Sequence, residues 1–180
     1  GSIAMAGNTA ASNIEGFIYT AMNAIYQTSL NFTSQNLGAK QYKRITQILW
    51  KCIAIVTVIG ILLGGVAILF SRQLLGIYSS DPQVIHYGIL RMQIIATTYF
   101  TCGIMDVSCG SMRGLGYSMM PTIVSLTGAC AFRVIWIMTV FQWFRSLDVL
   151  YFSYPVSWIL TLAAHLTCYF FASRKFPKED

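Results

Sequence analysis

Charged side chains are scarce in this chain of 180 residues. Only 10% of the residues are Asp, Glu, Lys or Arg, whereas a soluble domain carries roughly a quarter. Hydrophobic residues make up 56% of the chain, and the mean hydropathy is +0.60. This composition disfavours a soluble domain. The formal charge of +6 is explained below by membrane orientation, so no nucleic-acid partner is expected.

Motifs for catalysis and metal binding are also lacking. The five cysteines occur singly, without the CxxC spacing of a metal or redox site. The chain has only two histidines, His86 and His165, and no HExxH sequence. A GxSxG motif fails at Met120, which stands where the second glycine is required. We therefore expect no enzyme, no metal centre and no cofactor.

Long apolar segments dominate what is present. The run from Cys52 to Phe70 holds no charge, and the run from Val149 to Ala172 holds only uncharged polar residues and one histidine. About 20 apolar residues suffice to cross about 30 Å of hydrocarbon. We predict an all-α polytopic membrane protein in contact with the lipid bilayer, a single membrane domain over residues 1–180. Its five spans are expected at approximately residues 5–36, 47–70, 86–112, 119–144 and 149–172.

The basic residues alternate between the linkers and predict an orientation. One side carries Lys40, Lys43, Arg44, Lys51, Arg113, Arg174, Lys175 and Lys178. The other carries Arg72, Arg91 and Arg145 beside Asp81 and Asp148. By the positive-inside rule, residue 1 lies outside and residue 180 in the cytoplasm of a cell inner (plasma) membrane. A first span that runs inward with no helix before it suggests that an upstream helix is missing.

A polar stripe follows one face of the first expected span, with its apolar residues on the opposite arc. A helix lying on a membrane surface would carry cations on its polar face, yet none occurs before Lys40. The pattern predicts a membrane helix that faces a hydrated cavity, with packing between helices as the alternative. The stripe comprises Ser12, Glu15, Tyr19, Asn23, Gln27, Asn31 and Ser34. The candidate cavity-lining residues are Tyr19, Asn23, Tyr26, Gln27 and Asn31.

Two motifs carry a family resemblance. A polar helix ends in QNLGAK before a basic loop, and SMRGLGYSMMP lies between two later spans. In this order, they resemble the C-terminal lobe of the multidrug and toxic compound extrusion (MATE) transporters. The resemblance implies two lobes of six helices that export small organic cations against H⁺ or Na⁺ by alternating access. This chain would supply the second to sixth helices of the second lobe.

The resemblance also implies partners that this chain does not contain. They are the N-terminal lobe and the first helix of the second lobe, so the chain alone is expected to be insufficient for transport. Two other functions stay open. One is a flippase of related architecture that moves lipid-linked substrates, and the other is an inactive structural half that needs a partner chain.

Three charged residues within the expected spans are candidates for function. An unpaired carboxylate at membrane depth costs several kcal/mol, so Glu15 is interpreted either as a cation or proton coupling site or as a structural partner. Arg133 is the expected partner, in a buried ion pair between two helices. Asp106 is a second coupling candidate. In the sodium-coupled branch of the resembling family the functional carboxylate stands one turn earlier, at Gly103, so a structural role near the helix end is the alternative.

Overall fold

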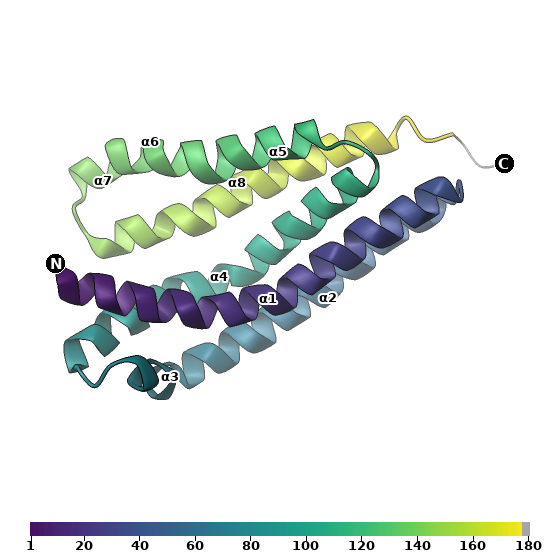
Figure 1. Cartoon of the computed structure of the whole chain (residues 1–180). Helices are drawn as coiled ribbons and strands as arrows, with labels where there is room; N and C mark the ends of the chain where they lie inside the picture. Colours follow the sequence, from purple (N-terminus) through teal and green to yellow (C-terminus); the bar gives the residue numbers. More distant parts are fainter. Residues whose placement is uncertain (178–180) are drawn as a thin grey trace.

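The computed structural model describes residues 1–177 and is helical, with no strand in that part of the chain (Figure 1). Four helices are long and continuous, and the remaining elements are short. In chain order they are α1 (Ser2–Gly38), α2 (Tyr42–Leu69), α3 (Ser71–Tyr78), α4 (Pro82–Gly114), α5 (Met119–Ser125), the π-helix η1 (Leu126–Ala131), α6 (Phe132–Met138), α7 (Val140–Trp143) and α8 (Leu147–Ser173).

The ends of the long helices follow local chemistry. The Asp81 side chain accepts a hydrogen bond from the Gln83 amide at 2.8 Å, with Pro82 in the first turn, so α4 begins earlier than residue 86. Ser146 caps α8 in the same way through the amide of Val149. Gly116 has a φ of +90°, which only glycine adopts without strain, and it turns the chain between α4 and α5.

Helix α4 is the centre of the fold. It packs against α1 and α2 on one side and against α8 on the other, and η1 and α5 to α7 pack along α8. Among the described residues, α1 and α8 have no backbone packing with each other. The helices therefore form two groups with α4 between them, as Figure 1 shows.

Glycines allow α4 to approach α1 and α2 closely. A Cβ atom at Gly7 would lie 2.6 Å from the Val84 carbonyl oxygen, and one at Gly64 would lie 2.6 Å from that of Ala96. Small residues at such crossings are the usual way in which membrane helices gain packing contacts. The close packing of α4 against α1 and α2 therefore requires glycine, which has no Cβ, at Gly7 and Gly64.

The span expected over residues 119–144 is not one regular helix. It passes through the π-helical segment η1 and breaks at Thr139, which has φ −116° and ψ −80°. The segment between the spans expected at 47–70 and 86–112 contains a helix that the sequence did not predict, α3. Its eight residues pack against α4 and α1 and are too short to have shown a helical period in the sequence.

Three described helical stretches are apolar and long enough to cross a membrane, namely Tyr42–Leu69, Met119–Trp143 and Leu147–Ser173. Helices α1 and α4 have 37 and 33 residues but are more polar. Large apolar side chains are exposed along α2 and α5 to α7, including Trp50, Ile61, Leu62, Ile123, Val134 and Trp143. Long helices with such apolar outer faces are those of an all-α polytopic membrane protein.

Candidate functional site

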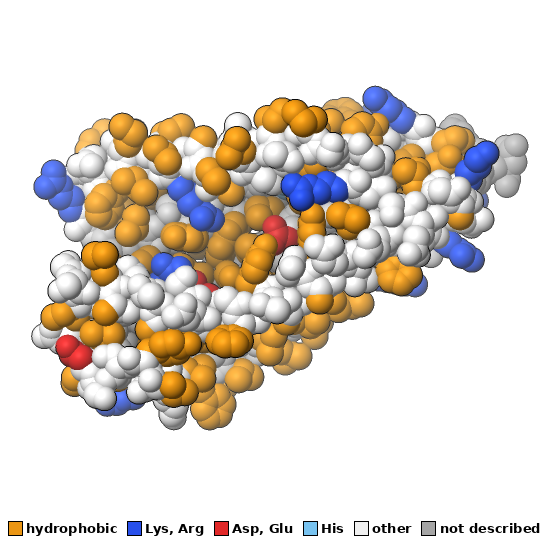
Figure 2. All heavy atoms as spheres, viewed as in Figure 1, with side chains coloured by type: hydrophobic (Ala, Val, Ile, Leu, Met, Phe, Trp, Pro, Cys, Tyr) orange, Lys and Arg blue, Asp and Glu red, His pale blue; other side chains and the backbone are white. Residues whose placement is uncertain are grey.

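A cavity of about 340 Å³ lies between the two groups of helices. Figure 2 shows the hollow, with acidic and basic side chains inside it. We call it the central cavity. Four elements line it: Ser12, Glu15, Gly16 and Tyr19 from α1, Ile95, Tyr99, Cys102 and Arg91 from α4, Arg133 from α6, and Tyr154 and Trp158 from α8.

Glu15 forms an ion pair with Arg91 at the wall of the central cavity. The Nη2 and Nε atoms of Arg91 donate to the two carboxylate oxygens at 2.8 and 3.1 Å. Glu15 is only 5% exposed. A two-point guanidinium–carboxylate contact of this kind fixes both side chains and neutralises both charges.

The expected pairing of Glu15 with Arg133 is wrong. Glu15 and Arg91 belong to α1 and α4, which pack directly, whereas α6 packs on α8, in the other group of helices. In the sequence Arg91 was placed among the residues of the outer face. Because α4 begins at Pro82, Arg91 lies well inside the helix, about 14 Å from its start at 1.5 Å per residue. The Asp81–Pro82 start signal was the clue to this depth.

Arg133 instead contacts aromatic and hydroxyl groups of α8. Its Nε donates to Ser157 Oγ at 3.0 Å, and its guanidinium carbon lies 4.0 Å from the centroid of the Tyr154 ring. Arg91 lies 5.5 Å from the centroid of the same ring. Cation–π contacts help to hold a guanidinium that has no carboxylate partner. Tyr154 is therefore shared by the two arginines of the central cavity.

The aromatic residues of α8 lie inside the protein. Tyr151 and Trp158 are 1% and 5% exposed, and the Tyr99 and Trp158 rings meet edge to face with centroids 5.5 Å apart. The fold turns these side chains of α8 toward the interior, and periodicity alone did not reveal this.

Asp106 lies on α4 beside the polar stripe of α1. The Tyr19 hydroxyl and the Arg113 guanidinium both act on its carboxylate electrostatically. Tyr19 also lines the central cavity, so it connects Asp106 to that space. Gly103, in contrast, faces the packed interior, where a Cβ would lie 2.7 Å from Val56 Cγ2 and 2.9 Å from Met22 Sδ.

Of the five candidate cavity-lining residues, only Tyr19 is among the residues that line the central cavity in the described part of the chain. Asn23 and Tyr26 are half-buried and Gln27 and Asn31 are exposed, on the continuation of the same arc of α1 beyond the central cavity. The Tyr26 hydroxyl accepts a hydrogen bond from Arg113 Nη1 at 2.8 Å. Arg113 Nη2 also donates to Thr122 Oγ1 at 3.3 Å, so these contacts tie α1, α4 and α5 together.

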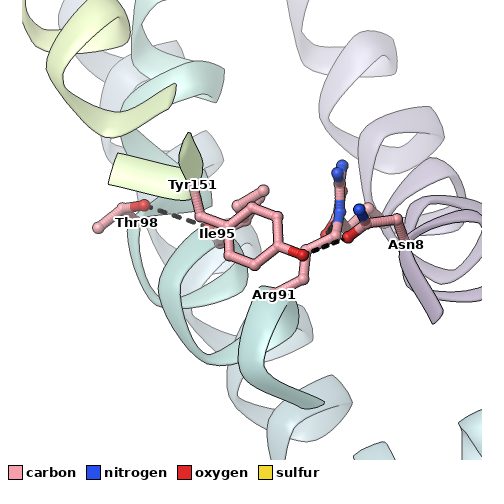
Figure 3. Close-up of polar contacts among 6 residues, drawn as sticks. Asn8, Arg91, Ile95, Thr98 and Tyr151 are labelled. Atoms are coloured by element: carbon pink, nitrogen blue, oxygen red, sulfur yellow. Dashed lines mark hydrogen bonds and ion pairs between the residues drawn. The ribbon is translucent and has the colours of Figure 1, made fainter. Parts of the chain in front are cut away.

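One hydrogen bond joins α1 to α8 at the end of the cavity nearest residue 1. The Tyr151 hydroxyl donates to Asn8 Oδ1 at 2.5 Å. Figure 3 shows this contact, with Tyr151 reaching from α8 to Asn8 on α1 and Arg91 beside the pair. Because the two helices share no backbone packing, this polar contact bridges them at that end.

Known proteins resemble this chain in both sequence and fold. The family model MatE matches residues 1–139. The "Probable multidrug resistance protein YoeA" of Bacillus subtilis (strain 168) is 23% identical over 146 residues, which cover 80% of this chain and 31% of the relative. The "FAD transporter" of Shewanella oneidensis is 24% identical over 123 residues, or 68% of this chain and 27% of the relative.

A solved structure supports the same architecture. The MATE transporter ClbM in complex with Rb⁺ superposes with a TM-score of 0.79 at 20% identity, covering 99% of this chain and 40% of that chain. At this identity the likeness concerns the fold. This chain spans about a third of the length of the curated relatives that it matches. Because the family model covers most of the helices that build the central cavity, the chain belongs to the MatE family of membrane transporters.

Proposed function

We propose that this chain is part of an alternating-access antiporter that exports organic molecules against H⁺ or Na⁺, without a cofactor and without enzymatic activity. The observation that carries the proposal is the central cavity, in which a neutralised ion pair, a further arginine and aromatic rings lie between two groups of helices. Polar and charged residues at membrane depth usually line a substrate or ion pathway. Membership in a transporter family supports the same role.

The second wall of the transport pathway would come from partners outside this chain. The polar arc of α1 continues beyond the central cavity with exposed amides, which a bilayer would not solvate. An N-terminal lobe and a first helix of this lobe would cover it, with residue 1 outside and residue 180 cytoplasmic in an inner membrane. The matched segments cover 31% and 27% of the lengths of the two relatives, which leaves room in proteins of that length for such partners.

Asp106 is the better of the two coupling candidates. A coupling carboxylate has to release its ion during the cycle, and Glu15 is held by two hydrogen bonds from Arg91. An arginine engaged in this way keeps both carboxylate oxygens occupied. Asp106 is half-buried, forms no ion pair within 4.0 Å in the described part of the chain, and interacts electrostatically with Tyr19 of the cavity wall. We assign coupling to Asp106 and a structural role to Glu15.

Two substrate classes fit the cavity differently. Small organic cations are the class that the family resemblance implies, and multidrug resistance is part of YoeA's name. A flippase for lipid-linked anions is the second candidate, because two arginines, Arg91 and Arg133, line the cavity. The FAD transporter among the relatives is named for a substrate that carries phosphates, which also favours a role for cavity arginines.

Transport in proteoliposomes tests the proposal. We would compare this chain alone with this chain co-reconstituted with an N-terminal MATE lobe, under an imposed proton or Na⁺ gradient, using one fluorescent organic cation and one fluorescent organic anion. Gradient-dependent movement of either compound only when both parts are present is the expected result. Transport by the chain alone, or movement that ignores both gradients, would contradict the proposed function.

A further inference from the structure

The charge of the central cavity is unbalanced. Its lining contains two guanidinium groups, Arg91 and Arg133, and a single carboxylate, Glu15. That carboxylate is already paired with Arg91. Within residues 1–177, Arg133 has no salt bridge to any acidic side chain. Among the lining residues, one guanidinium charge, that of Arg133, is therefore left without a carboxylate partner, and Asp106 is not one of these residues.

Arg133 also has unused hydrogen-bond donors. Its Nε is bound to Ser157, but its two Nη atoms donate to no described residue, and neither is among the buried polar atoms that lack a partner. They are therefore not buried without a partner, and Arg133 is one of the residues that line the cavity. Contacts to Ser157 and Tyr154 hold the guanidinium. A guanidinium held in one plane, with free paired N–H groups, matches the two oxygens of a carboxylate, sulfonate or phosphate.

Aromatic rings stand next to these donors. Tyr154 and Trp158 meet edge to face with ring centroids 5.9 Å apart, and Tyr99 meets Trp158 in the same manner. The guanidinium of Arg133 lies over the Tyr154 ring, 4.0 Å from its centroid. A planar ring of a ligand would find aromatic neighbours close to the free guanidinium nitrogens.

We propose that the central cavity binds organic anions in which an aromatic ring carries a carboxylate, sulfonate or phosphate group, and that Arg133 determines this specificity. The inference rests on the proposed function and replaces organic cations as the substrates of this cavity. A cation placed there would meet Arg133 with no free carboxylate among the lining residues to compensate for lost solvation. An anion would instead supply the negatively charged partner that Arg133 lacks among the described residues.

Binding of two ligands with the same ring and opposite charge tests the proposal. Naphthalene-2-sulfonate and trimethyl(2-naphthyl)ammonium would be measured by equilibrium dialysis against the whole chain in phosphatidylcholine nanodiscs, with empty nanodiscs as the blank. The sulfonate should bind at least roughly tenfold more tightly than the ammonium, because a hydrogen-bonded charge contributes about that factor.

Three variants locate the effect. Arg133→Gln should weaken sulfonate binding by roughly tenfold to a hundredfold and remove the preference for the anion. Arg133→Lys, which keeps the charge, should retain the preference at lower affinity. The matched control Arg145→Gln removes an exposed arginine that does not line the cavity, and it should leave binding unchanged. Size-exclusion profiles and helix content would be compared first, and Arg133→Lys serves if the glutamine variant does not fold.

A headgroup competitor separates a soluble aromatic anion from a lipid phosphate. Glycerol 3-phosphate should compete with the sulfonate at least roughly tenfold less well than 2-naphthyl phosphate, because it offers the anion without the ring. Equal competition, tighter binding of the ammonium, or sulfonate binding that survives Arg133→Gln would overturn the proposal. If organic cations are transported and the sulfonate does not bind, the organic-anion proposal is wrong and the proposed antiport function stands. If the sulfonate binds selectively but no transport is seen, the proposed antiport function is wrong and the organic-anion proposal stands.

Discussion

Arg91 donates two hydrogen bonds to Glu15, of 2.8 and 3.1 Å, across the interface between α4 and α1. The two side chains are 12% and 6% exposed, so both charges are largely removed from solvent. The pair closes the wall of the central cavity on one side, while Arg133 on the opposite side has no carboxylate among the described residues. Arg91 therefore has a structural role, and Arg133 is available to bind a ligand.

Removing one member of the Glu15–Arg91 pair should destabilise the protein strongly. We expect Glu15→Gln or Arg91→Gln to lower the free energy of unfolding by about 3 kcal/mol, because each leaves a buried charge without its partner. The double variant should lose less than the sum of the two single losses. Unfolding in mixed micelles would measure all three. A coupling energy near zero in the double-mutant cycle would show that the pair contributes nothing.

The close crossing of α2 and α4 should be sensitive to one methyl group at Gly64. Its Cβ would lie 2.6 Å from the Ala96 carbonyl oxygen, so Gly64→Ala must move one helix and is expected to cost about 1–3 kcal/mol. Gly65→Ala is the matched control, since a Cβ at the adjacent position meets nothing within 4 Å. It should be neutral or stabilise the helix by up to about 1 kcal/mol. Thermal unfolding in nanodiscs distinguishes the two, and equal effects would refute this packing argument.

The Asn8–Tyr151 hydrogen bond should restrict entry to the central cavity from the end near residue 1. Tyr151→Phe removes the donor, which is worth about 1 kcal/mol or a factor of about five in an opening equilibrium. Cys102 lines the cavity, so its labelling by a charged maleimide reports access in a protein whose other cysteines are replaced. We expect faster labelling in Tyr151→Phe and no change in Tyr78→Phe, where the ring lies on α3. Unchanged labelling in Tyr151→Phe would mean that this contact does not limit access.

Asp106 should be required for coupling and Glu15 for stability. In proteoliposomes that contain an N-terminal MATE lobe as well, Asp106→Asn should abolish the dependence of transport on the imposed gradient while the chain stays folded. Glu15→Gln should lower the amount of folded protein and leave the remaining molecules gradient-dependent. Asp148→Asn, at an exposed acidic residue outside the cavity, is the control. Coupling that persists in Asp106→Asn would exclude this residue as the coupling site.

The helical architecture could be predicted because membrane crossing imposes strong rules on sequence. Long apolar runs with polar ends reveal α2 and α8. Tyr19 of the polar stripe is among the residues that line the central cavity. Short or irregular elements carry no such signal. Helix α3 has eight residues, and η1 is a π-helical segment of six residues within an otherwise apolar span.

The sequence alone determined that this protein is a bundle of membrane helices of the MATE type, and that charged groups stand within its spans. Only the tertiary structure decided which of those groups meet. Depth along a helix made Glu15 and Arg133 look like partners, but the pairing depends on which helices touch. Small residues such as Gly7 bring α1 against α4, so Arg91 reaches Glu15 and Arg133 stays with Tyr154. Contacts between distant segments follow from packing, which no local pattern encodes.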